Sequence, residues 1–338
     1  MNLPDKIRKF DIIDYLGNGA FGFVYQAFDP LLKVDRAIKL IKVPNPEKFV
    51  QAVKEAQTLE SCRHKHIVDV KEVDIAMYEG THHVYIAMEY LSKGSVQKYL
   101  EKRFISVAES CKIISDALLG LEHAHNNNVL HRDIKPGNIL FGDNGEAKLS
   151  DFGLAINYHI DPSDTFGYRP HQPIEVIEGK PMSKLSDIYA MGITLHRLLN
   201  NIEKLPFTFS TIEEWHKAVK NKEYPTRLHS PHIPEKIIKI VNKAIDNRIN
   251  MRYQNTTQFR QAIEKIKFSI DWRPLNEDQW VGICSNDNYE ISKSHSRNGW
   301  SIEFKKNNRR VKEHCHKNLA EAEVDNTFFQ IIRESTLL

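Results

Sequence analysis

The first part of the chain is patterned as a small β-sheet. Residues 10–16, 23–28, 36–41 and 83–88 are short runs rich in aromatic and β-branched residues, which predict strands. Between the third and fourth runs, residues 46–62 place apolar side chains on one face of a predicted helix. We therefore expect a strand-rich unit with one main helix.

Beyond residue 95 the apolar positions are spaced as in helices. Residues 107–125 carry them at intervals of three and four, which predicts a packing helix that ends at the run Asn126 to Asn128. A second, strongly apolar helix is predicted to begin at Asp187. This middle part should be mostly helical.

Residues 268–338 change pattern again. Trp272, Trp280 and Trp300 are large apolar anchors, strand-like runs cover 279–285, 289–293 and 300–304, and residues 319–333 predict a helix. We expect a small β-rich module closed by a helix, and we recognise no family resemblance in this stretch.

Composition narrows the class of protein. With 338 residues there is room for two or three domains, and 47 Lys plus Arg against 44 Asp plus Glu give a net charge of +3, so neither a nucleic acid nor an acidic membrane is expected as a partner. The four cysteines lack paired CxxC spacing. No apolar run approaches the ~18 residues that span a bilayer, and the N-terminus lacks the apolar stretch of a signal peptide. These features favour a cytoplasmic protein with reduced thiols.

Two segments carry candidate chemistry. Residues 17–22 (GNGAFG) are rich in glycines, which let backbone N–H groups approach phosphate oxygens. Dinucleotide-binding turns share this spacing, but there the glycines open a helix, whereas here a strand follows; an ordinary glycine-rich hairpin is the other alternative. Residues 131–138 (HRDIKPGN) are followed by Asp151, Phe152 and Gly153. Carboxylate and amide oxygens of this kind bind Mg²⁺ and orient a hydroxyl.

These motifs together resemble the protein kinase family. HRDIKPGN is similar to the catalytic loop, DFG follows it, and GNGAFG with Val24 is similar to the phosphate-covering loop. The tripeptides HRD and DFG each occur by chance in unrelated chains. Here they occur in the family order, with Asn138 at the expected distance from Asp133, which makes chance a poor explanation. The resemblance covers the chain up to about Lys267.

The resemblance implies an α+β, bilobal fold. It has a small antiparallel β-sheet lobe with one main helix and a larger, mostly helical lobe, here followed by the C-terminal module. The expected division is residues 1–88 for the N-lobe, 89–92 for the hinge, 93–267 for the C-lobe and 268–338 for the accessory module.

The resemblance also implies roles in the catalytic loop. Asp133 would orient the substrate hydroxyl and accept its proton, and Lys135, typical of serine/threonine kinases, would neutralise charge on the γ-phosphate. Asn138 and Asp151 would bind Mg²⁺. His131 and Phe152 would be structural residues that stack with Leu59, with a catalytic His131 as the alternative.

A third set of residues would bind ATP. Lys39 would hold its α and β phosphates and pair with Glu55, for which Glu47 and Glu60 are rival candidates. Adenine would bond to the backbone of Glu89 and Leu91, with Met88 at the back of the pocket. The full set of expected cofactor-binding residues is Leu16, Gly17, Asn18, Gly19, Ala20, Phe21, Gly22, Val24, Ala37, Lys39, Glu89, Leu91 and Leu140.

The segment after DFG departs from the family pattern. Arg132 is typical of kinases activated by phosphorylation, so autophosphorylation of Ser163 or Thr165 is expected. Where Ala-Pro-Glu is usual the chain has Pro173, Ile174 and Glu175, and Tyr168 replaces a threonine. Glu175 is still expected to pair with Arg252. This departure leaves the mode of peptide-substrate recognition open.

The module has few chemical signals. Arg309, Arg310 and Lys312 suggest phosphate contacts, but from residue 268 on there are ten basic and eleven acidic side chains, which favours a solvated surface. His314, Cys315 and His316 invite a metal hypothesis, yet successive residues of a strand point to opposite faces. The module would dock a substrate, bind a partner or inhibit the kinase.

The expected function is therefore a serine/threonine protein kinase that uses Mg-ATP. A pseudokinase or binding scaffold is the alternative from another class, although a scaffold needs no complete set of catalytic residues. A small-molecule kinase on the same fold is a third hypothesis.

Overall fold

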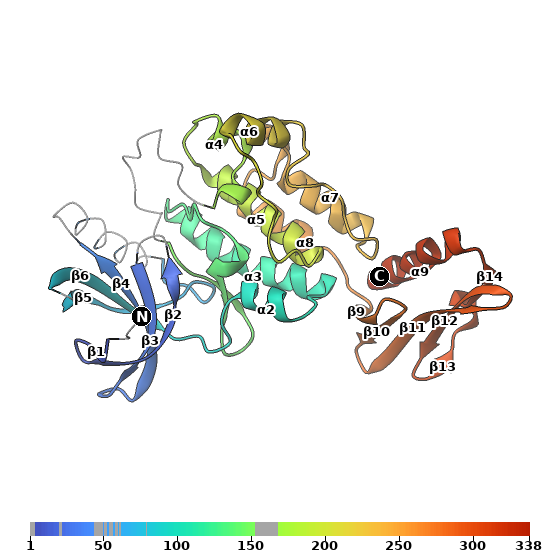
Figure 1. Ribbon diagram of the computed structural model, residues 1–338, viewed down its shortest axis with the longest axis horizontal. Coiled ribbons are helices and arrows are strands. Elements are labelled where there is room, and N and C mark those ends of the chain that lie inside the picture. Colours follow the sequence, from blue (N-terminus) through green and yellow to red (C-terminus); the bar gives the residue numbers. More distant parts are fainter. Residues whose placement is uncertain are drawn as a thin grey trace.

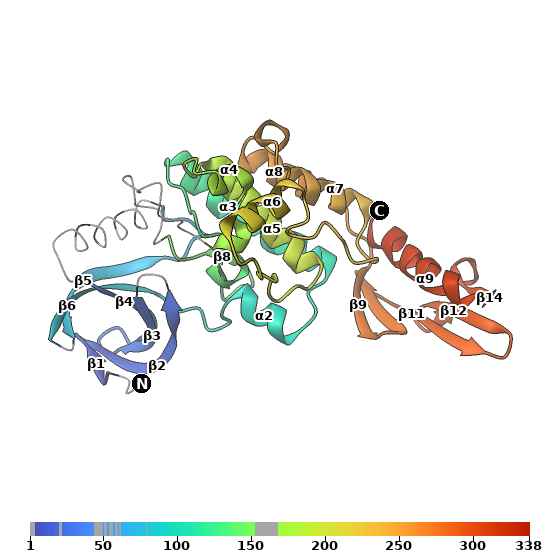
Figure 2. The same ribbon diagram turned by 45° about the horizontal axis from the view of Figure 1, so that its top comes forward.

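Three parts of the chain lie in a row in the computed structural model (Figures 1 and 2). The structure describes residues 4–19, 22–43, 50, 53, 57, 60, 62–78, 80–152 and 168–338. A β-sheet lobe stands at one end, a helical lobe in the middle and the C-terminal module at the other end. The α+β class and the bilobal architecture with an added module are confirmed.

The N-lobe is a six-stranded antiparallel sheet in the order β1-β2-β3-β4-β6-β5. Its core contains Phe10, Ile38 and Tyr85, and a Cβ on Gly22 would lie 2.0 Å from the Leu40 carbonyl oxygen, so the close approach of β3 to β4 requires glycine there. The strands are β1 (Lys6–Ile7), β2 (Phe10–Gly19), β3 (Gly22–Asp29), β4 (Val34–Lys42), β5 (Val70–Tyr78) and β6 (Thr81–Glu89).

The four predicted strands of this lobe are confirmed as β2, β3, β4 and β6. β5 was not predicted, because it alternates between charged residues and the exposed Val73 and Ile75. Within the predicted helix 46–62, positions 50, 53, 57 and 60 are helical, and the rest lies outside the described residues.

The C-lobe is built around α5, which is buried on all sides. The Ser183 hydroxyl caps its N-terminus, so the helix begins three residues before the predicted Asp187. α3 confirms the predicted packing helix. The helices are α2 (Val96–Lys102), α3 (Val107–Asn126), α4 (Ile174–Ile177), α5 (Lys184–Leu199), α6 (Ile212–Lys220), α7 (Glu235–Ala244) and α8 (Thr256–Glu264), joined by 3₁₀ turns η1 (Pro136–Asn138), η2 (Arg169–His171) and η3 (Ile249–Met251) and by the hairpin β7 (Ile139–Phe141) and β8 (Ala147–Leu149).

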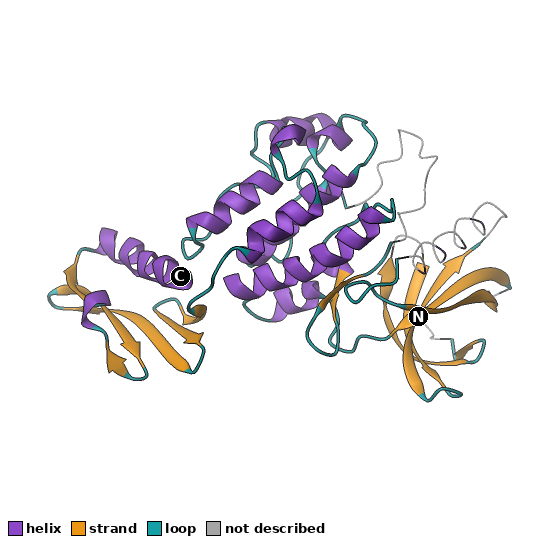
Figure 3. Cartoon of the chain, turned by 180° about the vertical axis from the view of Figure 1, so that it is seen from behind, coloured by secondary structure: helices purple, strands orange, loops and turns teal. Residues whose placement is uncertain are grey.

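The module is a second antiparallel sheet, one face of which is covered by a helix (Figure 3). Trp280, Ile302 and Phe328 lie in its core. Three strands and the helix were predicted; β9, β13 and β14 were not. The elements are β9 (Asp271–Asn276), β10 (Gln279–Cys284), β11 (Asp287–Ser296), β12 (Gly299–Lys306), β13 (Arg309–Arg310), η4 (Lys312–His314), β14 (His316–Leu319) and α9 (Glu321–Thr336).

The strand geometry expected around Cys315 is wrong. His314 ends the 3₁₀ turn η4 and His316 begins β14, so the three residues are not successive positions of one strand. The Cys315 N–H donates to the Lys312 carbonyl at 3.1 Å, which closes the turn. The His314 ring packs against Phe304, with the ring centroids 4.9 Å apart.

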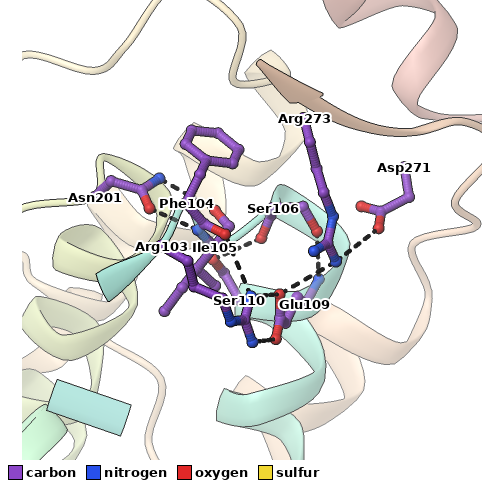
Figure 4. Close-up of polar contacts among 9 residues, drawn as sticks. All are labelled: Arg103, Phe104, Ile105, Ser106, Glu109, Ser110, Asn201, Asp271 and Arg273. Atoms are coloured by element: carbon purple, nitrogen blue, oxygen red, sulfur yellow. Dashed lines mark hydrogen bonds and ion pairs between the residues drawn. The ribbon is translucent and has the colours of Figure 1, made fainter. Parts of the chain in front are cut away.

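The module is seated on the loop between α2 and α3. Phe104 of that loop packs into the module core, with its ring 5.5 Å from Trp280 and 5.6 Å from His232. Burial lowers the pKa of His232 to about 4, so this cluster stays uncharged near neutral pH. Glu109 joins the two parts, because it binds Arg103 of the C-lobe at 2.5 Å and Arg273 of the module at 3.3 Å (Figure 4).

Replacing Phe104 by alanine is expected to weaken the contact between the module and the C-lobe. Losing the partly buried ring costs about 1–2 kcal/mol, which raises the undocked population roughly 5- to 30-fold. Trypsin cleavage after Lys265 or Lys267, between α8 and β9, should accelerate accordingly. Leu275→Ala is the control, since Leu275 lies on β9 and is 60% exposed. Equal cleavage rates for the two variants would show that Phe104 does not hold the module.

None of the helices within the described residues combines the length and the apolar character needed to cross a bilayer.

Candidate functional site

A cavity of about 290 Å³ lies between the N-lobe sheet and the C-lobe. β2, β3 and β4 line it from one side, and the hinge, α2 and β7 from the others. The sequence-predicted residues in its lining are Leu16, Gly17, Asn18, Val24, Ala37, Lys39, Met88, Glu89, Leu91, Asn138, Leu140 and Asp151. Side chains from both lobes thus meet in one site.

Some predicted residues fall elsewhere. Gly19 and Gly22 pair with each other at the end of the β2–β3 hairpin, and Gly22 packs against β4. Outside the described residues lie Ala20, Phe21, Glu47, Glu55, Leu59, Ser163 and Thr165. The proposed partnership of Lys39 with Glu55 therefore stays a prediction, and the rival Glu60 forms an ion pair with Arg63 at 3.3 Å.

Lys39 joins the two lobes across the cavity. Its position on the central strand β4, opposite Ile86 of β6 and Val24 of β3, keeps it only 4% exposed. Its Nζ lies 2.7 Å from Asp151 Oδ1. Burial alone would disfavour the charged carboxyl, but the Lys39 ammonium keeps the pKa of Asp151 below its ordinary value. Asp151 is therefore an ionised oxygen donor at the cavity wall.

The catalytic-loop segment is held by Asp187 of α5. The backbone N–H groups of His131 and Arg132 donate to its two carboxylate oxygens at 2.9 and 2.8 Å, and His125 Nε2 lies 2.9 Å from Oδ2. Arg132 has a φ of 68°, in the left-handed region, so this anchoring helps to hold a strained turn.

His131 is enclosed by its neighbours. Its Nε2 lies 3.0 Å from the Ser150 carbonyl oxygen, its Nδ1 accepts from the Asp133 N–H, and its ring is 4.5 Å from Phe152. Burial lowers the pKa of His131 below its ordinary value, so the ring is neutral near pH 7. Both ring nitrogens are occupied, which supports the structural interpretation over a catalytic histidine.

Asp133, Lys135 and Asn138 form one polar cluster beside the cavity. Lys135 Nζ lies 2.6 Å and Asn138 Nδ2 2.9 Å from Asp133 Oδ2. The other oxygen, Oδ1, is buried and has no hydrogen-bond partner among the described residues. Because a buried acceptor without a partner is costly, this atom is a candidate for binding a substrate group.

The hinge residues Glu89 and Leu91 both line the cavity. The Glu89 carboxylate is fixed by Lys148 Nζ at 2.7 Å and by the Asp69 N–H at 2.8 Å. Leu91 accepts a bond from Gly94, but its own N–H donates to no described residue. Leu91 thus brings to the cavity lining a main-chain donor that no described acceptor occupies.

Several cavity residues were not predicted. Val68, Gly94, Ser95 and Lys98 also line it. The Ser95 hydroxyl caps α2 by accepting the Lys98 N–H at 3.3 Å. A serine before a helical run is a capping signal, so the sequence does mark where α2 begins, although it does not show that this end faces the cavity.

The expected pair of Glu175 and Arg252 is confirmed. Arg252 Nη1 and Nη2 lie 2.5 and 2.8 Å from the two Glu175 oxygens, and both side chains are almost completely buried. The pair survives although Pro173 and Ile174 replace the usual residues before the glutamate.

Comparisons with known proteins agree with this geometry. The model of the protein kinase domain matches residues 10–265. Serine/threonine-protein kinase PrkC of Bacillus subtilis is 29% identical over 282 residues, covering 81% of this chain and 42% of PrkC. Aurora kinase A-A of Xenopus laevis is 28% identical over 254 residues, covering 73% of this chain and 60% of the relative. Serine/threonine-protein kinase STK11 of Gallus gallus is 33% identical over 215 residues, covering 58% of this chain and 47% of the relative.

The chain spans between about two fifths and three fifths of the length of these relatives. The matched region begins in β2 and ends at the close of α8, so it contains both lobes and the cavity between them. With more than half of its residues matched, the chain belongs to the protein kinase family.

Proposed function

We propose that this chain is a serine/threonine protein kinase that transfers the γ-phosphoryl group of Mg-ATP to a protein hydroxyl. The observation that carries the proposal is that the Lys39–Asp151 pair lines the same cavity as Asn138, which binds Asp133. Lys135, two residues after Asp133, favours serine or threonine as acceptor by resemblance. The names of the relatives PrkC and STK11 point to the same class.

The cavity residues would bind ATP. Leu16, Val24, Ala37 and Leu140 supply apolar side chains to the lining, which suits a flat base. The free Leu91 N–H would donate to adenine, and Lys39 would hold the phosphates with Glu55 as its proposed partner. Gly17 has a φ of 150° and open space around it, so phosphates meet no Cβ there.

Asn138 and Asp151 would hold Mg²⁺. Their donor set fits a hard cation, because Asp151 is ionised and the Asn138 amide nitrogen is turned toward Asp133, which leaves its oxygen for a ligand. The ion would neutralise phosphate charge. Both side chains line the same cavity.

Asp133 and Lys135 would act on the transferred group. The unpartnered Asp133 Oδ1 is an acceptor for the substrate hydroxyl, which it would orient and deprotonate. Lys135 keeps donors free besides the one facing Asp133 and would stabilise negative charge that develops on the phosphoryl oxygens.

Four further proposals accompany this function. Ser163 or Thr165 would be the site of autophosphorylation. The chain would divide into residues 1–88, 89–92, 93–267 and 268–338. The separate apolar clusters of the sheet lobe and of the module support this division. The module would dock a substrate or partner. A cytoplasmic location is supported by the free thiols of Cys111, Cys284 and Cys315.

The function predicts Mg²⁺-dependent labelling by γ-labelled ATP. With generic serine/threonine substrates, turnover should be on the order of 1–100 s⁻¹, and chelation of Mg²⁺ should abolish it because the phosphate charge is then unshielded. Label should appear on serine or threonine, and mapping it decides between Ser163 and Thr165. ATP binding without any transfer would favour a scaffold, and transfer to small molecules alone a small-molecule kinase.

A further inference from the structure

Tyr168 stands at a position where the family pattern predicts a small hydroxyl residue, and its ring faces the catalytic cluster. Lys135 Nζ lies 5.4 Å from the centroid of the Tyr168 ring. The same ammonium is 2.6 Å from Asp133 Oδ2. Lys135 is thus held by a carboxylate and by the face of an aromatic ring.

The Tyr168 ring is itself fixed by His171. The two rings meet edge to face, 5.0 Å apart at 70°. His171 Nδ1 lies 2.9 Å from the Ile134 carbonyl oxygen, between Asp133 and Lys135 in the chain. Since a carbonyl only accepts, Nδ1 carries the proton. Burial, with the Arg197 charge, holds the pKa of His171 well below its ordinary value, so the ring is neutral near pH 7.

His171 is anchored in turn to the rigid helix α5. Arg197 of that helix is 2% exposed, and its Nη1 lies 3.4 Å from His171 Nε2. Its Nη2 donates to the Gln97 side chain of α2 at 2.9 Å. A continuous set of contacts therefore runs from the buried centre of the C-lobe to the ammonium of Lys135.

We propose that Tyr168 is a positioning residue that keeps Lys135 in place for phosphoryl transfer. An aromatic face attracts a cation without using any of its N–H donors. The ammonium therefore stays oriented while its remaining donors are available to phosphoryl oxygens. This inference rests on the function proposed above.

Tyr168→Leu and Tyr168→Phe separate the ring from the rest of the side chain. Leucine keeps apolar bulk but removes the aromatic face, so kcat should fall about three- to thirtyfold with the KM for ATP unchanged. Phenylalanine keeps the face and should recover most of the wild-type rate. A full rate in Tyr168→Leu overturns the proposal, and so does an equal loss in both variants.

A double-mutant cycle tests whether Tyr168 acts through Lys135. In a Lys135→Met background, Tyr168→Leu should cause little further loss, whereas in the background of the exposed Lys180→Met its full effect should remain. A purely structural tyrosine would lower the rate equally in both backgrounds, which would overturn the proposal.

A second readout does not depend on turnover. With lysine ε-carbons labelled by ¹³C, the ring current should shift the Lys135 ε-methylene signal in the wild type and in Tyr168→Phe, but not in Tyr168→Leu. Identical Lys135 signals in all three would overturn the positioning role even in an inactive protein. Loss of transfer in the wild type with these shifts intact would instead count against the proposed function alone.

Discussion

Replacing Asp133 by asparagine is expected to slow phosphoryl transfer by about 10²- to 10⁴-fold. Asparagine has nearly the same shape, so the contacts to Lys135 and Asn138 keep their geometry, but an amide cannot take the proton of the substrate hydroxyl. Asp133 is not among the cavity-lining residues, so ATP affinity should change little. Single-turnover transfer and equilibrium nucleotide binding measure the two effects separately.

Asp143→Asn is the matched control for this experiment. Asp143 is an exposed acid in the turn between β7 and β8, close in sequence to the catalytic loop. Its replacement should leave the rate within twofold of the wild type. An Asp133→Asn variant that transfers phosphate as fast as this control would remove Asp133 from the proposed mechanism.

Arg252→Met is expected to destabilise the C-lobe by about 3–5 kcal/mol, because it leaves the Glu175 carboxylate buried without its partner. Arg252 is 1% exposed and also donates to the Asp246 and Leu185 carbonyl groups, which lose their donor as well. Urea denaturation followed by circular dichroism measures the change in the free energy of unfolding. Adding Glu175→Gln should restore part of the loss, since a neutral amide is cheaper to bury than an unpaired charge.

The control here is Arg248→Met, four residues earlier. Arg248 pairs with Asp246 at 2.9 Å, but its side chain is 65% exposed. Water screens exposed pairs of that kind, so this substitution should change the free energy of unfolding little. If the two arginine variants were equally stable, the Glu175–Arg252 pair would not be a structural support of this lobe.

Local patterns predicted the regular elements better than the connections. α3 and α5 were predicted because their apolar spacing persists over many residues. β9 was missed because Pro274 interrupts its pattern; proline is tolerated there because β9 is an edge strand. The turn at Cys315 was missed because three residues give no periodic signal.

The candidate site could be predicted in its residues but not in its geometry. Asp133, Lys135 and Asn138 all lie within the eight residues 131–138, so a single sequence motif identifies them. The contact of Lys39 with Asp151 joins residues 112 positions apart. The family resemblance placed both residues at the ATP site but paired Lys39 with Glu55, so this contact was not predicted. The Tyr168 ring beside Lys135 was beyond prediction, because the sequence shows a substitution and not where the new side chain lies.

The seat of the module has a practical consequence for spectroscopy. Three of the chain's four tryptophans lie in the module and none lies in the N-lobe, so the chain's ultraviolet emission comes mainly from the end farthest from the nucleotide cavity. Trp280 is the one beside Phe104 and His232 at the junction. Its emission is a label-free signal of whether the module is docked. A change in this emission on adding ATP would show that a conformational change at the nucleotide cavity reaches the module across the C-lobe.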